Sequence, residues 1–395
     1  MKSINSICLL SSRYPNVLTP TRHVFVQKLA HAFADIGLKV SIIAPIPINQ
    51  YICVYRNLPP TSCERSPSGR NVDLHYPRYI SFGQRNIVGV RTARFTTQCF
   101  AQAVDSVFRR SHIRPDVVYG HFIVPAGIAA AKIGKKYGIH AFAAFGESSS
   151  QSLRRYGLSK LKNDIESLAG IVSVSTANKE ELRKLRVFPS SRVSVFPNAV
   201  RSGKFFPQNQ RQARKKLGFP EESFIVAYVG QFSHRKGLLR VSQAVNTLDN
   251  VRVAFAGTGT LSPICDNCIY EGEVSPGIMP IFLNAADAFV LPTLSEGCSN
   301  AIIEAMACGL PIISSNLPFN EDILGEDNSI LVDPLDIKSI QAAITRLRDN
   351  PEERRAMGNA SVERTRHLTL EKRADGIRTW IEHIIDSIRS EREIR

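Results

Sequence analysis

Long apolar runs are absent from this chain of 395 residues. No 18 consecutive apolar residues occur, so the sequence offers no candidate for a helix that spans a bilayer. The opening residues, MKSINSICLLSSRYP, turn polar after Leu10 and lack the composition of a signal peptide. We therefore expect a first buried strand here, in a cytoplasmic protein.

Cysteines are few and irregularly spaced. The eight in the chain do not form the framework that a small disulfide-rich domain needs. Cys265 and Cys268 form a single Cys-x2-Cys pair, and no second pair completes the four ligands of a structural zinc site. We expect reduced cysteines and no metal site.

Acidic residues are scarce in the first half of the chain. Residues 1–198 contain 27 Lys and Arg against 10 Asp and Glu, a net charge of +17, whereas residues 199–395 contain 23 against 25, a net charge of −2. Such a field suits an anionic membrane surface, an anionic lipid carrier or nucleic acid, although a merely solvated surface would look the same. Because RNP-type aromatic runs, zinc-finger spacings and basic zippers are all missing, we expect no nucleic acid partner.

Arg residues between Arg78 and Arg94 are interleaved with bulky apolar residues. This composition is typical of an interfacial surface, and equally of an ordinary amphipathic segment. The preceding residues 46–75 are rich in Pro, Ser and Asn, and we expect an irregular excursion there.

Strand-length apolar runs alternate with helical segments along the whole chain, which predicts an α/β protein with parallel sheets. The length suits two domains, and no internal repeat or low-complexity linker is present. The tail carries an apolar stripe at helical spacing, expected to face a core: Trp380, Ile381, Ile384, Ile385 and Ile388.

The segment 287–316 carries the clearest signal. It predicts a strand over 288–294, a helix over 302–307 and a second strand from Pro311, which is one unit of a parallel sheet. Ligands of such sheets bind outside the carboxyl ends of the strands, and Glu296 falls at that edge.

Two carboxylates bracket the start of this predicted helix. Glu296 and Glu304 are the only fully charged side chains between Asp287 and Glu321, and apolar residues surround Glu304. A buried carboxylate is costly unless it is hydrogen-bonded, and either ligand hydroxyls or protein groups would serve. Between the two acids, backbone N–H groups at the helix start form an anion site from Gly297, Cys298, Ser299 and Asn300. An anion flanked by hydroxyl-bearing groups is the layout of a nucleotide-sugar.

The sequence EGCSNAIIE at residues 296–304 resembles the E-x7-E motif of the retaining glycosyltransferases of family 4, and the flanks AADAFVLPT and AMACGLPIISSN are similar to that family. The resemblance implies the GT-B fold, with two Rossmann-like parallel-sheet domains facing each other across a cleft. Residues 1–200 would form the acceptor-side domain, residues 201–370 the nucleotide-sugar domain, and residues 371–395 a helix crossing back to the first domain.

The resemblance also implies transfer of a sugar from a nucleotide-diphosphate sugar to a hydroxyl acceptor, with retention and with neither a metal ion nor a cofactor. The chain has no Asp-x-Asp signature of the metal-dependent GT-A type. In the family, an Arg after a Gly and a Lys before a Gly grip the diphosphate. Here Gly230 and Lys236 match, but Gln231 stands in the Arg position, and we expect Arg235 to supply the missing charge. Position supports this, because both cations lie where a predicted strand meets a helix start, although a solvated pair is the alternative.

Other donor-side roles follow only from the resemblance. Glu296 would hold hydroxyls of the donor sugar, and Glu304 those of the ribose. Gly-x-Gly and Glu-Val pairs would approach the nucleotide and its base: Gly257, Gly259, Glu273 and Val274.

In the first domain, His121 ends a predicted strand and begins an H-x3-P-x-G pattern whose His contacts the donor sugar in the family. A core histidine is the alternative. Glu147 follows another predicted strand, and the resemblance implies that it approaches the acceptor or the sugar. Arg22 and His23 replace family glycines in the first loop, where they are placed to reach an anionic acceptor or to be solvated loop charges.

We therefore predict a retaining glycosyltransferase acting on a glycan or lipid-linked acceptor in bacterial surface polysaccharide biosynthesis. It would be cytoplasmic, with the inner face of the cell membrane as a candidate surface. A GT-B epimerase or phosphorylase, a carbohydrate hydrolase with paired carboxylates, and a non-catalytic carbohydrate-binding protein are the alternatives.

Overall fold

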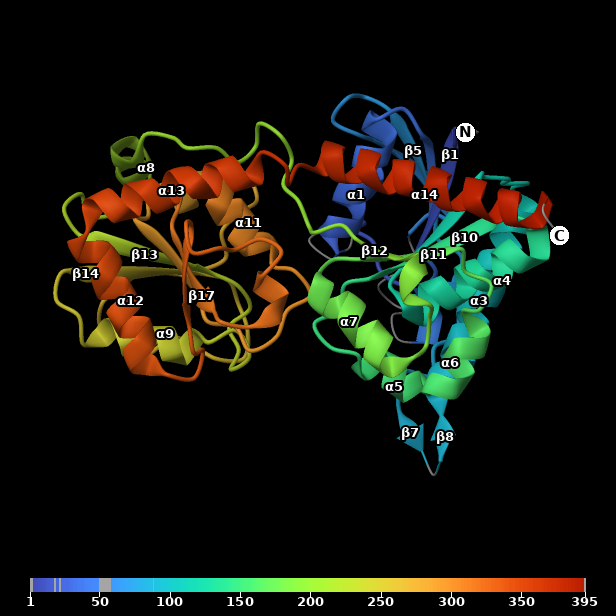
Figure 1. The fold of residues 1–395 in the computed structure, drawn as a ribbon, viewed down its shortest axis with the longest axis horizontal. Helices are drawn as coiled ribbons and strands as arrows, with labels where there is room; N and C mark the ends of the chain where they lie inside the picture. The colour runs from blue at the N-terminus through green and yellow to red at the C-terminus, as the bar shows by residue number, and fades with distance from the viewer. Residues whose placement is uncertain (1–2, 18, 21–22, 50–57, 88, 394–395) are drawn as a thin grey trace. The chain divides into compact units, whose positions relative to one another are not determined.

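The chain forms two units, each with its own parallel sheet (Figure 1). The first unit contains Met1–Phe196 and Leu370–Arg395, and the second contains Pro197–Thr369. The boundaries expected at residues 200 and 370 lie close to these. The computed structural model describes residues 3–17, 19–20, 23–49, 58–87, 89–393.

The first unit is built on an eight-stranded sheet in the order β12-β11-β10-β9-β1-β2-β5-β4. All neighbouring strands are parallel except β4 and β5. The strands are β1 (Ser6–Ser11), β2 (Lys39–Ile43), β4 (Thr61–Arg65), β5 (Asn71–His75), β9 (Val117–His121), β10 (His140–Phe145), β11 (Gly170–Ser173) and β12 (Val193–Val195). Two short ladders accompany the sheet, β3 (Ile46–Pro47) with β6 (Arg78–Tyr79) and β7 (Asn86–Ile87) with β8 (Val90–Arg91).

Helices cover both faces of this sheet because the strand order runs outward in opposite directions from β1 and β9. In Figure 1, α1 and α14 lie side by side, whereas α3 packs against α4. The helices are α1 (Val24–Asp35), α3 (Thr92–Arg110), α4 (Ile128–Tyr137), α5 (Gln151–Tyr156), α6 (Leu158–Asp164), α7 (Thr176–Leu185) and α14 (Leu370–Glu393). A π-helical turn (Ile123–Gly127) precedes α4, and a 3-10 turn (Ser190–Arg192) precedes β12.

The tail helix α14 packs on the first unit through its apolar stripe. Ile381 and Ile385 are buried, and the Trp380 ring lies 5.7 Å from that of Phe142. Glu382 accepts the backbone N–H of Ile4 at 3.0 Å, which ties the helix to the start of the chain. Burial of one helical face is therefore what holds this distant segment in the first unit.

The expectation of an irregular excursion over residues 46–75 was wrong for its described part. Strands β4 and β5 form a hairpin, and β5 extends the parallel sheet beside β2. Val72 and Leu74 are buried while Asn71 and Asp73 are exposed, so this strand follows the period of two. Val72 and Leu74 are the only apolar residues of β5, and they follow a Pro-Ser-Gly turn. This alternation is too short to be recognised easily as a strand.

The second unit has a six-stranded, fully parallel sheet in the order β15-β14-β13-β16-β17-β18. Its strands are β13 (Phe224–Val229), β14 (Val251–Ala256), β15 (Cys268–Gly272), β16 (Ala288–Leu291), β17 (Ile312–Ser315) and β18 (Ser329–Val332). Helices α9 and α12 pack together on one face, and α11 and α13 on the other (Figure 1). The helices are α8 (Gln210–Leu217), α9 (Leu238–Asn246), α10 (Met279–Asn284), α11 (Asn300–Ala307), α12 (Ile337–Asp349) and α13 (Pro351–Thr365), with a 3-10 turn (Pro318–Asn320) after β17.

A buried ion pair joins α8 to the start of β16. Nη2 of Arg214 lies 2.6 Å from Oδ2 of Asp287, and the side chains are 6% and 11% exposed. The same carboxylate oxygen accepts the N–H of Ile225, and Nε of Arg214 donates to the carbonyl of Ala285. Both charges are thus hydrogen-bonded as well as paired, which is the condition for tolerating them in a core.

We expect Asp287→Ala to lower the free energy of unfolding by about 3–5 kcal/mol, because it leaves the Arg214 guanidinium buried without a counter-charge. Chemical denaturation measures the loss. Glu353→Ala is the matched control, since its pair with Arg346 is exposed and should be worth about 1 kcal/mol or less. Equal losses of unfolding free energy in the two variants would contradict the conclusion that the Arg214–Asp287 pair is buried and stabilising.

Candidate active site

The second sheet reverses its strand order between β13 and β16, which lie side by side and parallel. Ligands of α/β sheets bind at such a point, outside the carboxyl ends of the strands. The loop after β13 carries Arg235 and Lys236, and the loop after β16 carries Thr293 and Glu296. The topology therefore brings together two segments that are about sixty residues apart in sequence.

Three side chains converge on one oxygen of Glu296. Its Oε1 lies 2.5 Å from Nζ of Lys236 and 2.9 Å from Nη1 of Arg235, and it accepts the Thr293 hydroxyl at 2.9 Å. The Glu296 and Lys236 side chains are 12% and 13% exposed, and Thr293 is fully buried. These partly desolvated contacts make a strong, well-located charge cluster.

Arg235 is the second cation of this cluster, and its expected role toward a diphosphate stays a prediction. Its Nη1 also donates to the carbonyl of Ser295 at 2.5 Å, and its own carbonyl accepts the N–H of Leu294. Gln231 is exposed, and its carbonyl accepts the hydroxyl of Tyr228. Arg235 and Lys236 therefore form an adjacent pair of cations at the switch point.

The sequence left open whether ligand or protein groups satisfy Glu296, and for Oε1 the partners are protein groups. Sequence reasoning missed Thr293, because a threonine in the loop just after a buried strand has no distinguishing signal. Burial, and then the nearby Glu296, raise the pKa of the Tyr228 hydroxyl well above its usual range.

Helix α11 begins at Asn300, directly after this cluster. Ser299 is its N-cap and accepts the N–H of Ile302, while the Asn198 amide donates to the carbonyl of Cys298 at 2.9 Å. Gly297, Cys298 and Ser299 are buried. The first N–H groups of a helix have no acceptor within it, and its dipole is positive here, so the helix start adds a second attraction for an anion.

Glu304 differs from its expectation. It lies in the second turn of α11, and it is half-buried rather than buried, although Ile302, Ile303 and Ala305 around it are fully buried. The expected high cost of a core carboxylate at this position was therefore wrong. Its assigned role toward ribose hydroxyls stays a prediction.

The glycines of the Gly-x-Gly turn are required by backbone packing. A methyl group on Gly257 would overlap the carbonyl of Gly230, and one on Gly259 would overlap that of Phe232. Gly257 also has φ +150°, and the N–H of Phe232 donates to the carbonyl of Thr258. This close packing joins the loops that follow β13 and β14.

The Glu-Val pair lies just after β15. Glu273 is exposed and its Oε1 accepts the Thr258 hydroxyl at 3.5 Å, while Val274 is half-buried. Glu273 and Gly257 thus belong to adjoining loops at the carboxyl ends of neighbouring strands, β15 and β14. Their assigned roles toward a base remain predictions.

His121 ends β9 at the switch point of the first sheet, beside Ser11 at the end of β1. It is buried among aromatic rings, with Phe122 at 4.9 Å and Phe25 at 5.5 Å between ring centroids. Burial, and then the charges of Arg373 and His23, lower the pKa of His121 to about 3. The imidazole is therefore neutral at physiological pH and offers one hydrogen-bond donor and one acceptor.

Two further features favour a functional role for His121. Its Nδ1 is inaccessible and has no hydrogen-bond partner among the described residues. The next residue, Phe122, has φ 72° and ψ 147°, a region that costs a non-glycine residue on the order of 1–3 kcal/mol. Such strain concentrates at functional sites, and no residue pattern in the sequence predicts it.

Glu147 lies two residues beyond β10. Oε1 accepts the hydroxyl of Ser152 at 2.9 Å, whereas Oε2 is inaccessible and has no partner among the described residues. Burial raises the pKa of Glu147 to about 7. Its role toward an acceptor or sugar is untested and stays a prediction.

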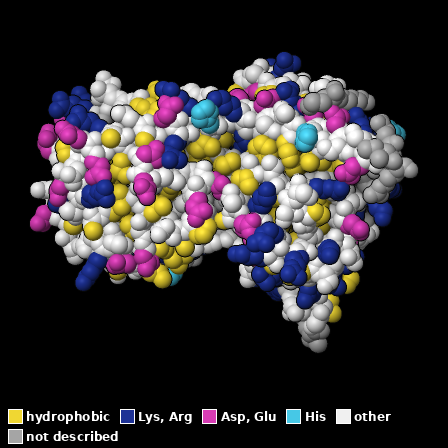
Figure 2. All heavy atoms as spheres, in the orientation of Figure 1, with side chains coloured by type: hydrophobic (Ala, Val, Ile, Leu, Met, Phe, Trp, Pro, Cys, Tyr) yellow, Lys and Arg dark blue, Asp and Glu magenta, His cyan; other side chains and the backbone are white. Residues whose placement is uncertain are grey.

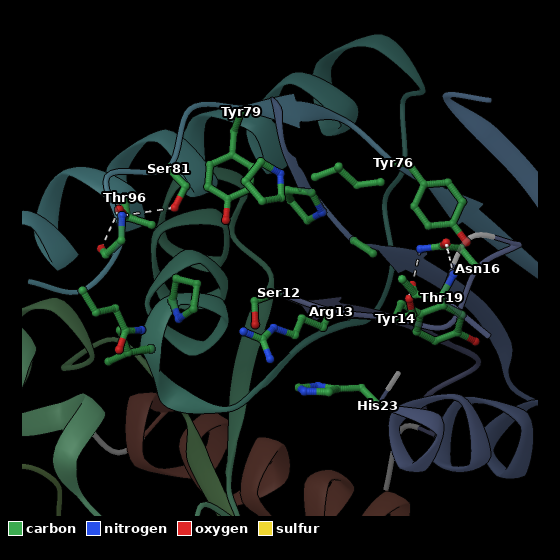
Figure 3. Close-up of a pocket in the computed structure, with 18 residues that line it drawn as sticks. Ser12, Arg13, Tyr14, Asn16, Thr19, His23, Tyr76, Tyr79, Ser81 and Thr96 are labelled. Carbon is green, nitrogen blue, oxygen red and sulfur yellow. Dashed lines mark hydrogen bonds between the residues drawn. The ribbon is translucent and has the colours of Figure 1, made fainter. Parts of the chain in front are cut away.

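A pocket of about 370 Å³ opens in the first unit beside the loop after β1 (Figure 3). Arg13 and His23 are its basic residues, and none of the described lining residues is acidic. Figure 3 shows the Arg13 side chain and the Tyr79 hydroxyl pointing toward the middle of the pocket. His23 thus lines this pocket, and its role toward an anionic acceptor stays a prediction; Arg22 lies outside the described residues.

We expect Gly259→Ala to lower the free energy of unfolding by roughly 1–3 kcal/mol, because the new methyl group must displace the backbone of Phe232. Gly277→Ala is the matched control, since no atom lies within 4 Å of its Cβ position; its effect should stay within about 0.5 kcal/mol. Urea denaturation compares the two, and a Gly259 variant as stable as the Gly277 variant would refute the packing argument.

Glu147 should make stability depend on pH. Its ordinary pKa is 4.5 and its folded-state pKa is about 7, so between these values the folded state keeps a proton that the unfolded state releases. The stabilisation is complete below about pH 4.5 and is lost as the pH rises through 7. Glu147→Gln should therefore match the parent near pH 4.5 and exceed its stability by about 3 kcal/mol at pH 8. The exposed Glu166→Gln variant serves as the control, and a constant difference across this range would rule the effect out.

Comparison with known proteins identifies the family. A model described as Glycosyltransferase Family 4 matches residues 23–203, and one described as Glycosyl transferases group 1 matches residues 209–364, so the two together span most of the chain. The protein named teichuronic acid biosynthesis glycosyltransferase TuaC, from Bacillus subtilis, is 26% identical over 86% of this chain and 88% of its own. A UDP-Gal:alpha-D-GlcNAc-diphosphoundecaprenol alpha-1,3-galactosyltransferase from Escherichia coli is 30% identical over 43% of this chain and 48% of its own.

Solved structures share the fold. A sucrose-phosphate synthase from Thermosynechococcus elongatus superposes with a TM-score of 0.77 at 18% identity, covering 97% of this chain and 100% of that one. Anabaena HepE in complex with UDP and glucose gives a TM-score of 0.70 at 14% identity, covering 96% and 99%. The expected GT-B fold with two Rossmann-like domains is confirmed, and the chain belongs to the glycosyltransferases of family 4.

Proposed function

We propose that this glycosyltransferase moves a sugar from a nucleotide-diphosphate donor to a hydroxyl of a lipid-linked acceptor, with retention and without a metal ion, in surface polysaccharide assembly. The observation that carries the proposal is the pair of cations on Glu296 beside the start of α11. Two positive side chains and a helix N-terminus at a sheet's switch point form a site for a diphosphate.

The cations would act on the leaving group. As the glycosidic bond breaks, negative charge grows on the diphosphate, and Arg235 and Lys236 would stabilise that charge more than the ground state. Both cations contact Oε1 of Glu296. A diphosphate carries more charge and more acceptor oxygens than one carboxylate, so it would draw the cations away and free Glu296 for hydroxyls of the sugar. Two protein cations would balance the charge of the diphosphate, which supports a reaction that needs no metal ion.

The acceptor assignment draws on charge and on the relatives. The first unit holds the excess of Lys and Arg, and its pocket presents Arg13 and His23 without a described acid. One relative is named for a diphosphoundecaprenol-linked acceptor, and the relative that matches most of the chain is named for teichuronic acid biosynthesis. A lipid-linked diphosphate sugar has the charge for this pocket and would be met at the inner face of the cell membrane.

The alternatives differ in their products. A GT-B phosphorylase would release a sugar phosphate and an epimerase would release no acceptor product, whereas transfer releases a nucleoside diphosphate. A hydrolase would release a free sugar, because water would then take the place of the acceptor.

We expect a nucleoside diphosphate to raise the melting temperature, in a series comparing UDP, GDP and ADP. Saturation at 100 times Kd adds about 2.7 kcal/mol to stability. Arg235→Gln and Lys236→Gln should each weaken binding roughly 10- to 100-fold, because each removes a charge-assisted hydrogen bond worth about 1.5–3 kcal/mol.

Lys338→Gln is the control for this series, since Lys338 is an exposed cation of the same unit and its loss should leave binding unchanged. The proposal fails if none of the three nucleotides shifts the melting temperature, or if both site variants bind as tightly as the Lys338 variant.

A further inference from the structure

Exposed apolar side chains gather in one short segment of the first unit. Of the eleven strongly exposed large apolar side chains in the described chain, four fall between residues 80 and 95: Ile80, Phe82, Val90 and Phe95. Phe82 and Phe95 are 51% and 55% exposed, and their rings meet edge to face with centroids 6.2 Å apart. Exposed apolar clusters of this kind mark interaction surfaces.

Hydrogen bonds hold this segment in a defined shape. The N–H of Phe82 donates to the Thr96 hydroxyl at 2.9 Å, and that hydroxyl donates to the carbonyl of Gly83 at 2.9 Å. The N–H of Arg85 donates to the Thr92 hydroxyl at 2.8 Å, which closes the base of the β7–β8 hairpin. The aromatic pair is therefore presented outward by a fixed frame, and Figure 1 shows the hairpin projecting beyond α5 and α6.

Four cations line an open pocket next to this frame: Arg91, Arg94, Arg154 and Lys160. The other residues that line it are uncharged. A methyl group on Gly157 would overlap Nη1 of Arg91 and lie 3.0 Å from Nη2 of Arg94, so the two guanidinium groups lie side by side. Figure 2 shows Lys and Arg side chains gathered over α5, α6 and the neighbouring α7.

The positive charge of this pocket is only partly compensated. Arg154 pairs with Glu181 at 3.4 Å and Lys160 with Asp164 at 2.8 Å. Among the described residues, no carboxylate lies within ion-pair distance of Arg91 or Arg94. Adjacent like charges repel each other, and a phosphate group between them would turn that repulsion into two charge-assisted hydrogen bonds.

We propose that the cationic pocket and the cluster Ile80, Phe82, Val90 and Phe95 together form a docking surface for an anionic phospholipid bilayer. The guanidinium groups would bind lipid phosphates while the apolar side chains enter the boundary between headgroups and acyl chains. Exposed aliphatic side chains in the same segment favour a bilayer over a single-stranded nucleic acid, which would use stacking surfaces.

The proposed docking surface adjoins the pocket beside the loop after β1. The inference rests on the proposed function, because a lipid-linked acceptor is the reason for the enzyme to bind a membrane. Ser81, Gly83 and Thr96 line that pocket, while Phe82 and Phe95, which neighbour them in the chain, are exposed. One side of the segment thus faces the candidate acceptor and the other side faces outward. A lipid-linked substrate held at the bilayer surface would reach the pocket without leaving the membrane.

Vesicle flotation tests the surface on the full chain. The protein should float with phosphatidylcholine vesicles that contain phosphatidylglycerol and not with phosphatidylcholine alone. Arg91→Gln/Arg94→Gln should weaken partitioning roughly 30-fold, about fivefold for each charge removed near the membrane. Phe82→Ser/Phe95→Ser should weaken partitioning onto the vesicles at every salt concentration, because it removes apolar contacts. Added salt should weaken partitioning of the parent protein, because it screens the charges.

Lys215→Gln/Lys216→Gln, on exposed positions of the second unit, removes the same charge and should leave flotation unchanged. The proposal is overturned if the Arg and Lys double variants float alike, if both vesicle types bind alike, or if a single-stranded oligonucleotide binds while vesicles do not. Melting temperatures with nucleoside diphosphates, recorded on the same variants, report the donor site separately. Loss of nucleotide binding with intact flotation would therefore count against the proposed function and leave the docking surface standing.

Discussion

A single carboxylate oxygen, Oε1 of Glu296, fixes the chemistry of the second unit. It contacts Lys236 and Arg235 from the loop after β13, and Thr293 from the loop after β16. Two adjacent cations would repel each other and turn toward solvent if this oxygen did not hold them. Because the strands are direct neighbours and the sheet reverses its order between them, the contact also ties together the two loops that form the ligand edge. The position of both cations beside the start of α11 depends on this one acceptor.

The sequence was sufficient where local and global signals agreed. The apolar runs on either side of the helical segment 302–307 predicted strand, helix and strand, and β16, α11 and β17 lie there. The sequence was insufficient where the outcome depended on the direction in which a side chain points. Apolar neighbours suggested that Glu304 is buried, yet the helix turns that side chain partly toward solvent. Likewise, no pattern of residue types announces that the Thr293 hydroxyl will meet a carboxylate three residues later.

Short, half-exposed elements were the other failure. The β4–β5 hairpin contributes only Val72 and Leu74 to the core, and its signal is too weak to separate from a loop rich in Ser and Pro. The Gly-x-Gly turn shows the opposite problem, since one motif admits two physical causes. Backbone contact with Gly230 and Phe232 is enough to require Gly257 and Gly259. A ligand is therefore not needed to explain these glycines, although the same contact assembles the loop edge at which a nucleotide would lie.

The first unit presents a different electrostatic design. His121 is neutral because burial opposes its charge, so it can orient a hydroxyl but cannot attract an anion. If the acceptor is anionic, as proposed, the attraction would come from Arg13 and His23 at the nearby pocket, and from the wider excess of Lys and Arg in this half of the chain. Separating long-range attraction from short-range orientation suits a substrate whose charged diphosphate lies at some distance from its reacting hydroxyl. The same segment that lines the pocket exposes Phe82 and Phe95 on its outer side. Residues that line the pocket and residues that would meet a membrane therefore belong to one continuous, hydrogen-bonded piece of chain.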